Sequence, residues 1–131
     1  MSGAVRELRL VITTEDFEQA LSFWRDELGL EEQLAVRSDD GRVAILKAGM
    51  ATLEIADRNQ ARFIDEMEVG RAGVSGQFRV ALQVDDVGAV TAKLEAAGAS
   101  VLGAPRLTPF RSTNARLEGP DGVQLTLFEM E

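Results

Sequence analysis

The sequence predicts an α+β protein of two βαβββ modules in tandem, with curved mixed sheets enclosing a cleft and helices on the convex side. One observation is the segment 78–98, where apolar and polar residues alternate before apolar residues recur at helical spacing. The other is that segment 6–29 repeats this strand–helix pattern, with Asp16 and Asp86 at the two predicted helix starts. These aspartates lie 70 positions apart, about half the chain, which indicates an internal duplication.

Each half continues after its helix with three further strands. In the first half we predict strands at 31–37, 42–47 and 51–56, and Asp57 is expected to cap a short helix that ends at Met67. In the second half we predict a short strand at 100–102, a loop over 103–109, and strands at 112–117 and 123–130. Glycines at 70, 73 and 76 mark a connector. The expected division is therefore 1–66 for the first module, 67–77 for the connector and 78–131 for the second module, within one compact domain.

Composition excludes several classes of function. The chain has 131 residues, of which 45% are hydrophobic, enough to bury a core. A net charge of −8 argues against a nucleic-acid partner, because phosphates require a basic surface. No apolar run is long enough to span a membrane and no signal peptide is evident, so we expect a cytoplasmic protein without a membrane partner. The chain contains no cysteine and no histidine, which excludes disulfides, Cys-based zinc sites and a Ser-His-Asp triad.

The duplicated βαβββ pattern resembles the vicinal-oxygen-chelate superfamily, the group of glyoxalases, bleomycin-resistance proteins and extradiol dioxygenases. The resemblance covers almost the whole chain. The segments that carry it are ITTEDFEQALSFWRDELGLEE (12–32), VALQVDDVGAVTAKLEAAGASV (80–101) and the closing GPDGVQLTLFE (119–129). It implies a small-molecule site between the two modules and a homodimeric assembly.

The resemblance also implies where a metal would lie in the metal-dependent members. The four strand positions that hold it there correspond to Arg9, Glu54, Arg79 and Thr126. Only Glu54 could ligate a metal in the usual way, since a guanidinium is a permanent cation without a lone pair to offer. We therefore predict that no metal and no other cofactor is bound.

Strand alternation places these four residues on one face of the sheet, together with Gln83 and Gln124. That face is open to three interpretations: a solvated sheet face, a salt-bridged plug, or the lining of a binding cavity. In the last case one positive charge is left over to receive a ligand carboxylate, phosphate or carbonyl. We also expect Phe110, Arg111 and Asn114 to close one mouth of the cavity. The full set of candidate ligand-binding residues is Arg9, Glu54, Arg79, Gln83, Phe110, Arg111, Asn114, Gln124 and Thr126.

The sequence thus favours a metal-independent protein of the bleomycin-resistance kind. It would sequester or carry an antibiotic-like or metabolite ligand with an anionic or acceptor group, as a homodimer. The alternative is a lyase, isomerase or dioxygenase of the same superfamily, or an acid–base catalyst that uses Glu54. Two flanking arginines are expected to lower the pKa of Glu54 and weaken it as a base. A third alternative is a non-binding interaction module.

Overall fold

The computed structural model describes residues 5–38 and 40–131, so residues 1–4 and 39 of the predicted first module lie outside the described residues. The first half contains β1 (Val5–Thr14), α1 (Phe17–Leu21) with a π-helical continuation (Ser22–Glu27), β2 (Glu31–Ser38), β3 (Gly41–Ala48) and β4 (Ala51–Asp57). Then come α2 (Arg58–Val69), β5 (Phe78–Val84), α3 (Val87–Ala96), β6 (Ser100–Leu107), β7 (Ser112–Glu118), a short 3₁₀ turn (Pro120–Gly122) and β8 (Gln124–Met130).

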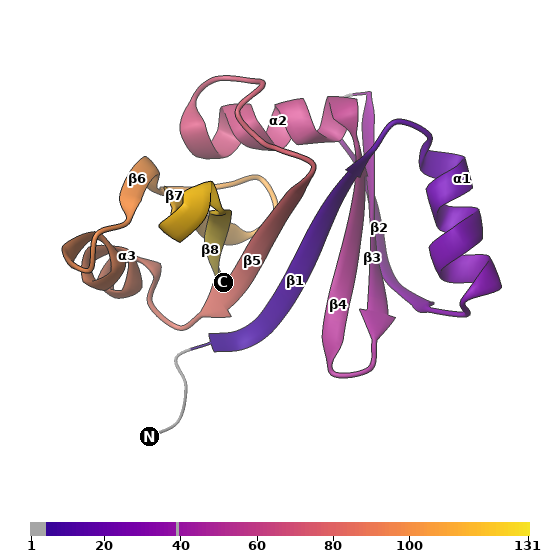
Figure 1. Cartoon of the computed structure of the whole chain (residues 1–131), viewed down its shortest axis with the longest axis horizontal. Coiled ribbons are helices and arrows are strands. Elements are labelled where there is room, and N and C mark those ends of the chain that lie inside the picture. Colours follow the sequence, from indigo (N-terminus) through magenta and orange to yellow (C-terminus); the bar gives the residue numbers. More distant parts are fainter. Residues whose placement is uncertain (1–4, 39) are drawn as a thin grey trace.

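All strands form one curved, mixed sheet in the order β2-β3-β4-β1-β5-β8-β7-β6 (Figure 1). β1 and β5 pair antiparallel at its centre, so the two modules join edge to edge. Within each module the first strand pairs parallel with the last, β1 with β4 and β5 with β8. The predicted fold class is confirmed.

The two halves begin their helices in the same way. Asp16 Oδ1 accepts the backbone N–H of Gln19 at 3.0 Å, and Asp86 Oδ1 accepts that of Ala89 at 2.9 Å. Each aspartate thereby satisfies one of the N–H groups that the first turn leaves without a helical partner. The identical caps agree with the 70-residue offset between the halves.

Two separate apolar cores lie beneath α1 and α3, on the convex side of the sheet (Figure 1). Under α1, Phe17 and Leu21 pack against Leu46 and Ile55. Under α3, Val87 lies in a cluster with Val84, Ala115, Leu117 and Leu127. Because these cores hold the convex face, the opposite face of the sheet is free to carry a mixture of apolar and polar side chains.

Helix α2 is not part of the repeat. It lies between the two modules and contacts β3 and β4 of the first as well as β6 and β7 of the second (Figure 1). Gly103 permits this close approach, because a Cβ there would lie 1.7 Å from the backbone oxygen of Glu68. The helix extends to Val69, beyond the predicted end at Met67, and Gly70 ends it with φ 87°. It therefore occupies residues 67–69 of the predicted connector.

The predicted loop at 103–109 is wrong over most of its length, since β6 continues to Leu107. Its pairing with β7 shifts register around Gly103 and again before Arg106. These irregularities break the alternation by which a strand is recognised. Pro105 is tolerated because β6 is an edge strand. None of the helices in the described part of the chain is long and apolar enough to cross a membrane.

Candidate functional site

A cavity of about 370 Å³ lies between the inner face of the sheet and α2. Much of its wall is apolar and comes from both modules: Leu34, Val36, Val43, Ile45, Ile64, Ala81, Pro109, Phe110, Phe128 and Met130. Polar side chains form the rest: Arg9, Glu54, Gln60, Glu68, Arg79, Arg111, Ser112, Asn114 and Thr126. The cavity therefore combines apolar walls with a charged and hydrogen-bonding region.

The structure places seven of the nine candidate residues around this cavity: Arg9, Glu54, Arg79, Phe110, Arg111, Asn114 and Thr126. Gln83 and Gln124 do not line it. Gln124 is engaged elsewhere, because its Oε1 accepts from Arg116 Nη1 at 2.9 Å and its Nε2 donates to the backbone oxygen of Val74. Gln83 lies farther along β5, beside Glu7 of β1.

Arg9 is neutralised mainly by a neighbour on its own strand. Its Nε donates to Glu7 Oε2 at 2.9 Å, whereas its Nη1 lies 3.9 Å from Glu54 Oε1. The guanidinium also lies 4.7 Å from the centre of the Phe128 ring. Although burial opposes ionisation, hydrogen bonds from Arg9 and Thr52 lower the pKa of Glu7.

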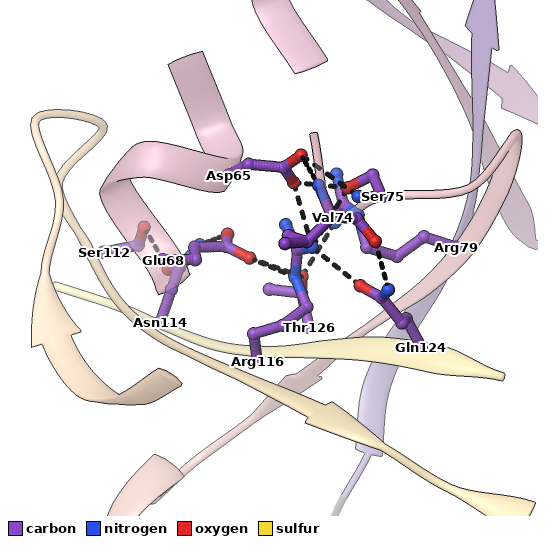
Figure 2. A network of polar contacts seen from close by, with 10 residues as sticks. All are labelled: Asp65, Glu68, Val74, Ser75, Arg79, Ser112, Asn114, Arg116, Gln124 and Thr126. Atoms are coloured by element: carbon purple, nitrogen blue, oxygen red, sulfur yellow. Dashed lines mark hydrogen bonds and ion pairs between the residues drawn. The ribbon is translucent and has the colours of Figure 1, made fainter. Parts of the chain in front are cut away.

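Sequence reasoning missed a buried charge cluster that joins α2 to the second module (Figure 2). Arg116 Nε donates to Glu68 Oε1 at 2.9 Å, and its Nη1 donates to Asp65 Oδ1 at 3.0 Å. Acidic side chains on a helix usually face solvent, yet Asp65 and Glu68 are each 1% exposed. Two features of the sequence could have indicated this cluster. Asp65 and Glu68 are three positions apart and therefore lie on one helix face, and alternation along β7 puts Arg116 on the same face as Asn114.

Thr126 links this cluster to Arg79 (Figure 2). Its Oγ1 accepts from Arg79 Nη1 at 2.8 Å and donates to Glu68 Oε1 at 2.7 Å. Glu68 Oε2 in turn accepts from Asn114 Nδ2 at 2.7 Å. Thus Arg79 and Thr126, two of the four positions that the family resemblance equates with metal ligands, are hydrogen-bonded to each other.

The expected spare positive charge on this face stays a prediction. In the described part of the chain the charged side chains that line the cavity are three arginines and two glutamates: Arg9, Arg79, Arg111, Glu54 and Glu68. Outside this lining, Glu7 pairs with Arg9, and Arg116 pairs with Asp65 and Glu68. The charges are unevenly paired. Arg79 is 7% exposed and forms no ion pair with any described residue, while Arg9 and Arg116 both do.

The predicted lowering of the Glu54 pKa is wrong. Burial is the largest effect and raises the pKa of Glu54; Arg79 and Arg9 act to lower this pKa, and smaller effects of Glu68 and Glu7 act to raise it. Burial also lowers the pKa of Arg79, but a guanidinium keeps its proton at any ordinary pH. Glu54 is thus a carboxyl group held toward its neutral form beside a fixed cation.

These residues do not fit a metal ion. Arg9 and Arg79 offer no lone pair, and the Thr126 hydroxyl is already hydrogen-bonded to Arg79 and Glu68. Across residues 5–38 and 40–131, no three His, Cys, Asp or Glu side chains are grouped to hold a metal.

Two βαβββ modules that join edge to edge, each with a helix on the convex side, define a class of fold. Residues 8–127 match the model of the Glyoxalase/Bleomycin resistance protein/Dioxygenase superfamily, and the chain belongs to this family. No curated protein sequence matches the chain.

Several solved structures share the fold. A hypothetical protein from Bacillus halodurans C-125 superposes with a TM-score of 0.75 at 16% identity, covering 98% of this chain and 96% of that one. Methylmalonyl-CoA epimerase from Mycobacterium tuberculosis gives 0.71 at 20% identity, covering 100% and 92%. A Streptomyces coelicolor methylmalonyl-CoA epimerase variant in complex with 2-nitronate-propionyl-CoA gives 0.71 at 22% identity, covering 98% and 96%. At these identities the similarity shows the fold alone.

Proposed function

We propose that this protein binds, without a metal, a small molecule that has an apolar body and an anionic or acceptor group. The observation that supports this most is the state of Arg79. Its guanidinium lines the cavity, is 7% exposed and has one hydrogen bond, to Thr126, but no ion pair in the described part of the chain. A buried guanidinium with no direct ion pair is unfavourable while some of its N–H groups lack acceptors, and a ligand oxygen would accept hydrogen bonds from them.

The remaining walls suggest how the ligand lies. Leu34 and Val36 of β2 face the cavity from the first module, and Phe110 and Met130 face it from the second. A volume of about 370 Å³ accommodates one or two aromatic rings with a short polar substituent. The polar group would point to Arg79 and the apolar body to these side chains, as expected for an antibiotic-like or metabolite ligand that is sequestered or carried.

A thermal-shift screen of small aromatic and aliphatic acids, run with a chelator and then with added divalent metals, tests this proposal. Ligands that bind the folded state raise the unfolding midpoint by mass action. We expect acids such as benzoate to raise it more than toluene, which has the same ring without the carboxylate, and we expect no dependence on metal. If shifts appear only when a metal is added, the metal-independent proposal is wrong.

A second candidate function is supported by Glu54. Its carboxyl lines the same cavity, and burial raises its pKa toward the range that suits a general acid or base. In an isomerase, ionised Glu54 would take a proton from a carbon next to a ligand carbonyl, and Arg79 would stabilise the enolate oxygen. Water would then give a proton to the opposite face of that carbon, and Glu54 would release its proton to the solvent. The structural similarity to methylmalonyl-CoA epimerases is compatible with this candidate.

Proton exchange separates the two candidates. A ligand found in the screen that carries such a carbon is incubated with the protein in D₂O. Isomerase chemistry predicts deuterium at that carbon with wild type and none with Glu54→Gln. A binding protein predicts no exchange above the rate without protein.

We also propose a homodimer formed through the convex face of β1 and β5. In Figure 1, α1 and α3 lie to the two sides of these strands. Leu8, Leu10 and Phe78 on that face are 45%, 36% and 56% exposed. Because β1 and β5 are paired at the centre of the sheet, these side chains form one apolar strip that a second copy would cover.

A further inference from the structure

We propose that Thr126 and Glu68 are positioning residues, which hold Arg79 so that its unused N–H groups point into the cavity. This inference rests on the proposed binding function, since it concerns how the ligand anchor is held. It assigns a role to a threonine at a position inherited from metal sites and to a glutamate of α2, the helix outside the repeat.

The hydrogen bonds of this group have a defined direction. Thr126 Oγ1 gives its proton to Glu68 Oε1 at 2.7 Å, which leaves its lone pairs free to accept from Arg79 Nη1 at 2.8 Å and from Arg116 Nε at 3.2 Å. A hydroxyl has one proton and two acceptor sites, so each is in use. Glu68 thereby fixes the rotation of the hydroxyl, and the hydroxyl fixes Arg79.

Both carboxylate oxygens of Glu68 already accept hydrogen bonds within the protein. Its Oε1 accepts from Thr126 and Arg116, and its Oε2 accepts from Asn114. A ligand therefore gains little from Glu68, although Glu68 lines the cavity. Arg79 differs: Nε and Nη2 have no hydrogen bond to any described residue, and neither is fully shielded from solvent, in contrast to the unpaired Nη2 of Arg116.

The first module shows why a hydroxyl in this place matters. There Arg9 donates directly to the carboxylate of Glu7, with Nε at 2.9 Å and Nη2 at 3.4 Å. Glu7 therefore neutralises the charge of Arg9 and accepts from two of its N–H groups. In the second module the neutral Thr126 stands between Arg79 and Glu68. It orients the guanidinium without cancelling its charge. Arg79 thus remains a positioned cation for a ligand.

The test is an NMR titration of wild type and Thr126→Val with benzoate and toluene, since NMR measures millimolar affinities in fast exchange. Valine keeps the shape but loses the hydroxyl. We expect benzoate to bind Thr126→Val about tenfold more weakly, as for loss of a hydrogen bond that supports a charged group, and toluene to bind about as before. Thr126→Ser, which keeps the hydroxyl, should restore benzoate affinity.

Thr91→Val is the matched control, because Thr91 is a buried threonine of α3 whose hydroxyl has no partner among the described residues. It should change neither affinity. Equal benzoate affinities for wild type and Thr126→Val would overturn the positioning role while leaving the binding function intact. If neither probe shifts signals of the cavity residues in wild type, the proposed function itself fails.

A second measurement needs no substitution. The side-chain Nε–H of Arg79 in the free protein should be rigid by ¹⁵N relaxation, in contrast to that of the exposed Arg111 at the mouth of the cavity. A mobile Arg79 side chain would overturn the inference even if Thr126→Val failed to fold.

Discussion

Arg116 Nη1 lies 3.0 Å from Asp65 Oδ1, and the two side chains are 0% and 2% exposed. Asp65 Oδ2 also accepts the backbone N–H groups of Val74 and Ser75 at 3.1 Å each. The pair therefore joins α2, β7 and the segment that leads into β5. Removing one partner would leave the other charged and without solvent.

We expect Arg116→Met to lower the free energy of unfolding by about 3–5 kcal/mol, the usual cost of breaking a buried ion pair on one side. Urea unfolding measures it. Arg106→Met, at an exposed position of β6, is the control and should have little effect. A loss no larger than that of the control would show that the cluster does not stabilise the fold.

Gly103→Ala should destabilise the protein by at least about 2 kcal/mol, because the new methyl group would overlap the backbone of α2. A Cβ at Gly103 would lie 1.7 Å from the oxygen of Glu68, whereas one at Gly76 would meet nothing within 4 Å. Gly76→Ala is thus the matched control. Similar unfolding midpoints for the two variants would contradict the position of α2 against β6.

The stability of the protein should depend on pH through Glu54. Its pKa is raised in the folded state, so folding favours the protonated form, and this contribution is complete below the ordinary glutamate pKa of 4.5. It is lost as the pH rises through the folded-state pKa. Glu54→Gln should therefore gain stability relative to wild type between low and neutral pH, measured by urea unfolding. Glu31→Gln, on exposed β2, controls for the loss of one carboxylate. A constant difference between wild type and Glu54→Gln across this range would count against a raised pKa of Glu54.

Leu10→Lys should convert the proposed dimer to a monomer, because a charge would enter the apolar strip on β1 and β5. Analytical ultracentrifugation at micromolar concentration distinguishes the two states. Met50→Lys is the control, since Met50 is fully exposed in the turn between β3 and β4. A monomeric wild type would refute the assembly.

Strand alternation was sufficient to predict which side chains share the inner face of the sheet. The period of two assigns Arg9, Glu54, Arg79 and Thr126 to one side, and all four line the cavity. The role of α2 was not predictable in this way. An acidic helix usually lies with its charges in solvent, and only its docking against Gly103 brings Asp65 and Glu68 inside.

The pKa shift of Glu54 was also predicted in the wrong direction. Counting only the two arginines predicts a lowered pKa, but burial is the largest effect and raises it, with smaller effects of Glu68 and Glu7 in the same direction. Gln124 was likewise assigned to the cavity because Arg116, its actual partner, had not been recognised. Alternation within a single strand carries no information about contacts with segments that are distant in the sequence.

The central claim is that Arg79 is the cationic anchor of a metal-independent binding cavity. It is tested most directly by measuring benzoate affinity and unfolding free energy together for wild type and Arg79→Met. We predict roughly 10- to 100-fold weaker benzoate binding in the variant, corresponding to about 1.5–3 kcal/mol for a hydrogen bond to a charged group, with toluene binding retained. Unchanged benzoate affinity together with unchanged or higher stability would contradict the claim, because Arg79 would then only fill the interior.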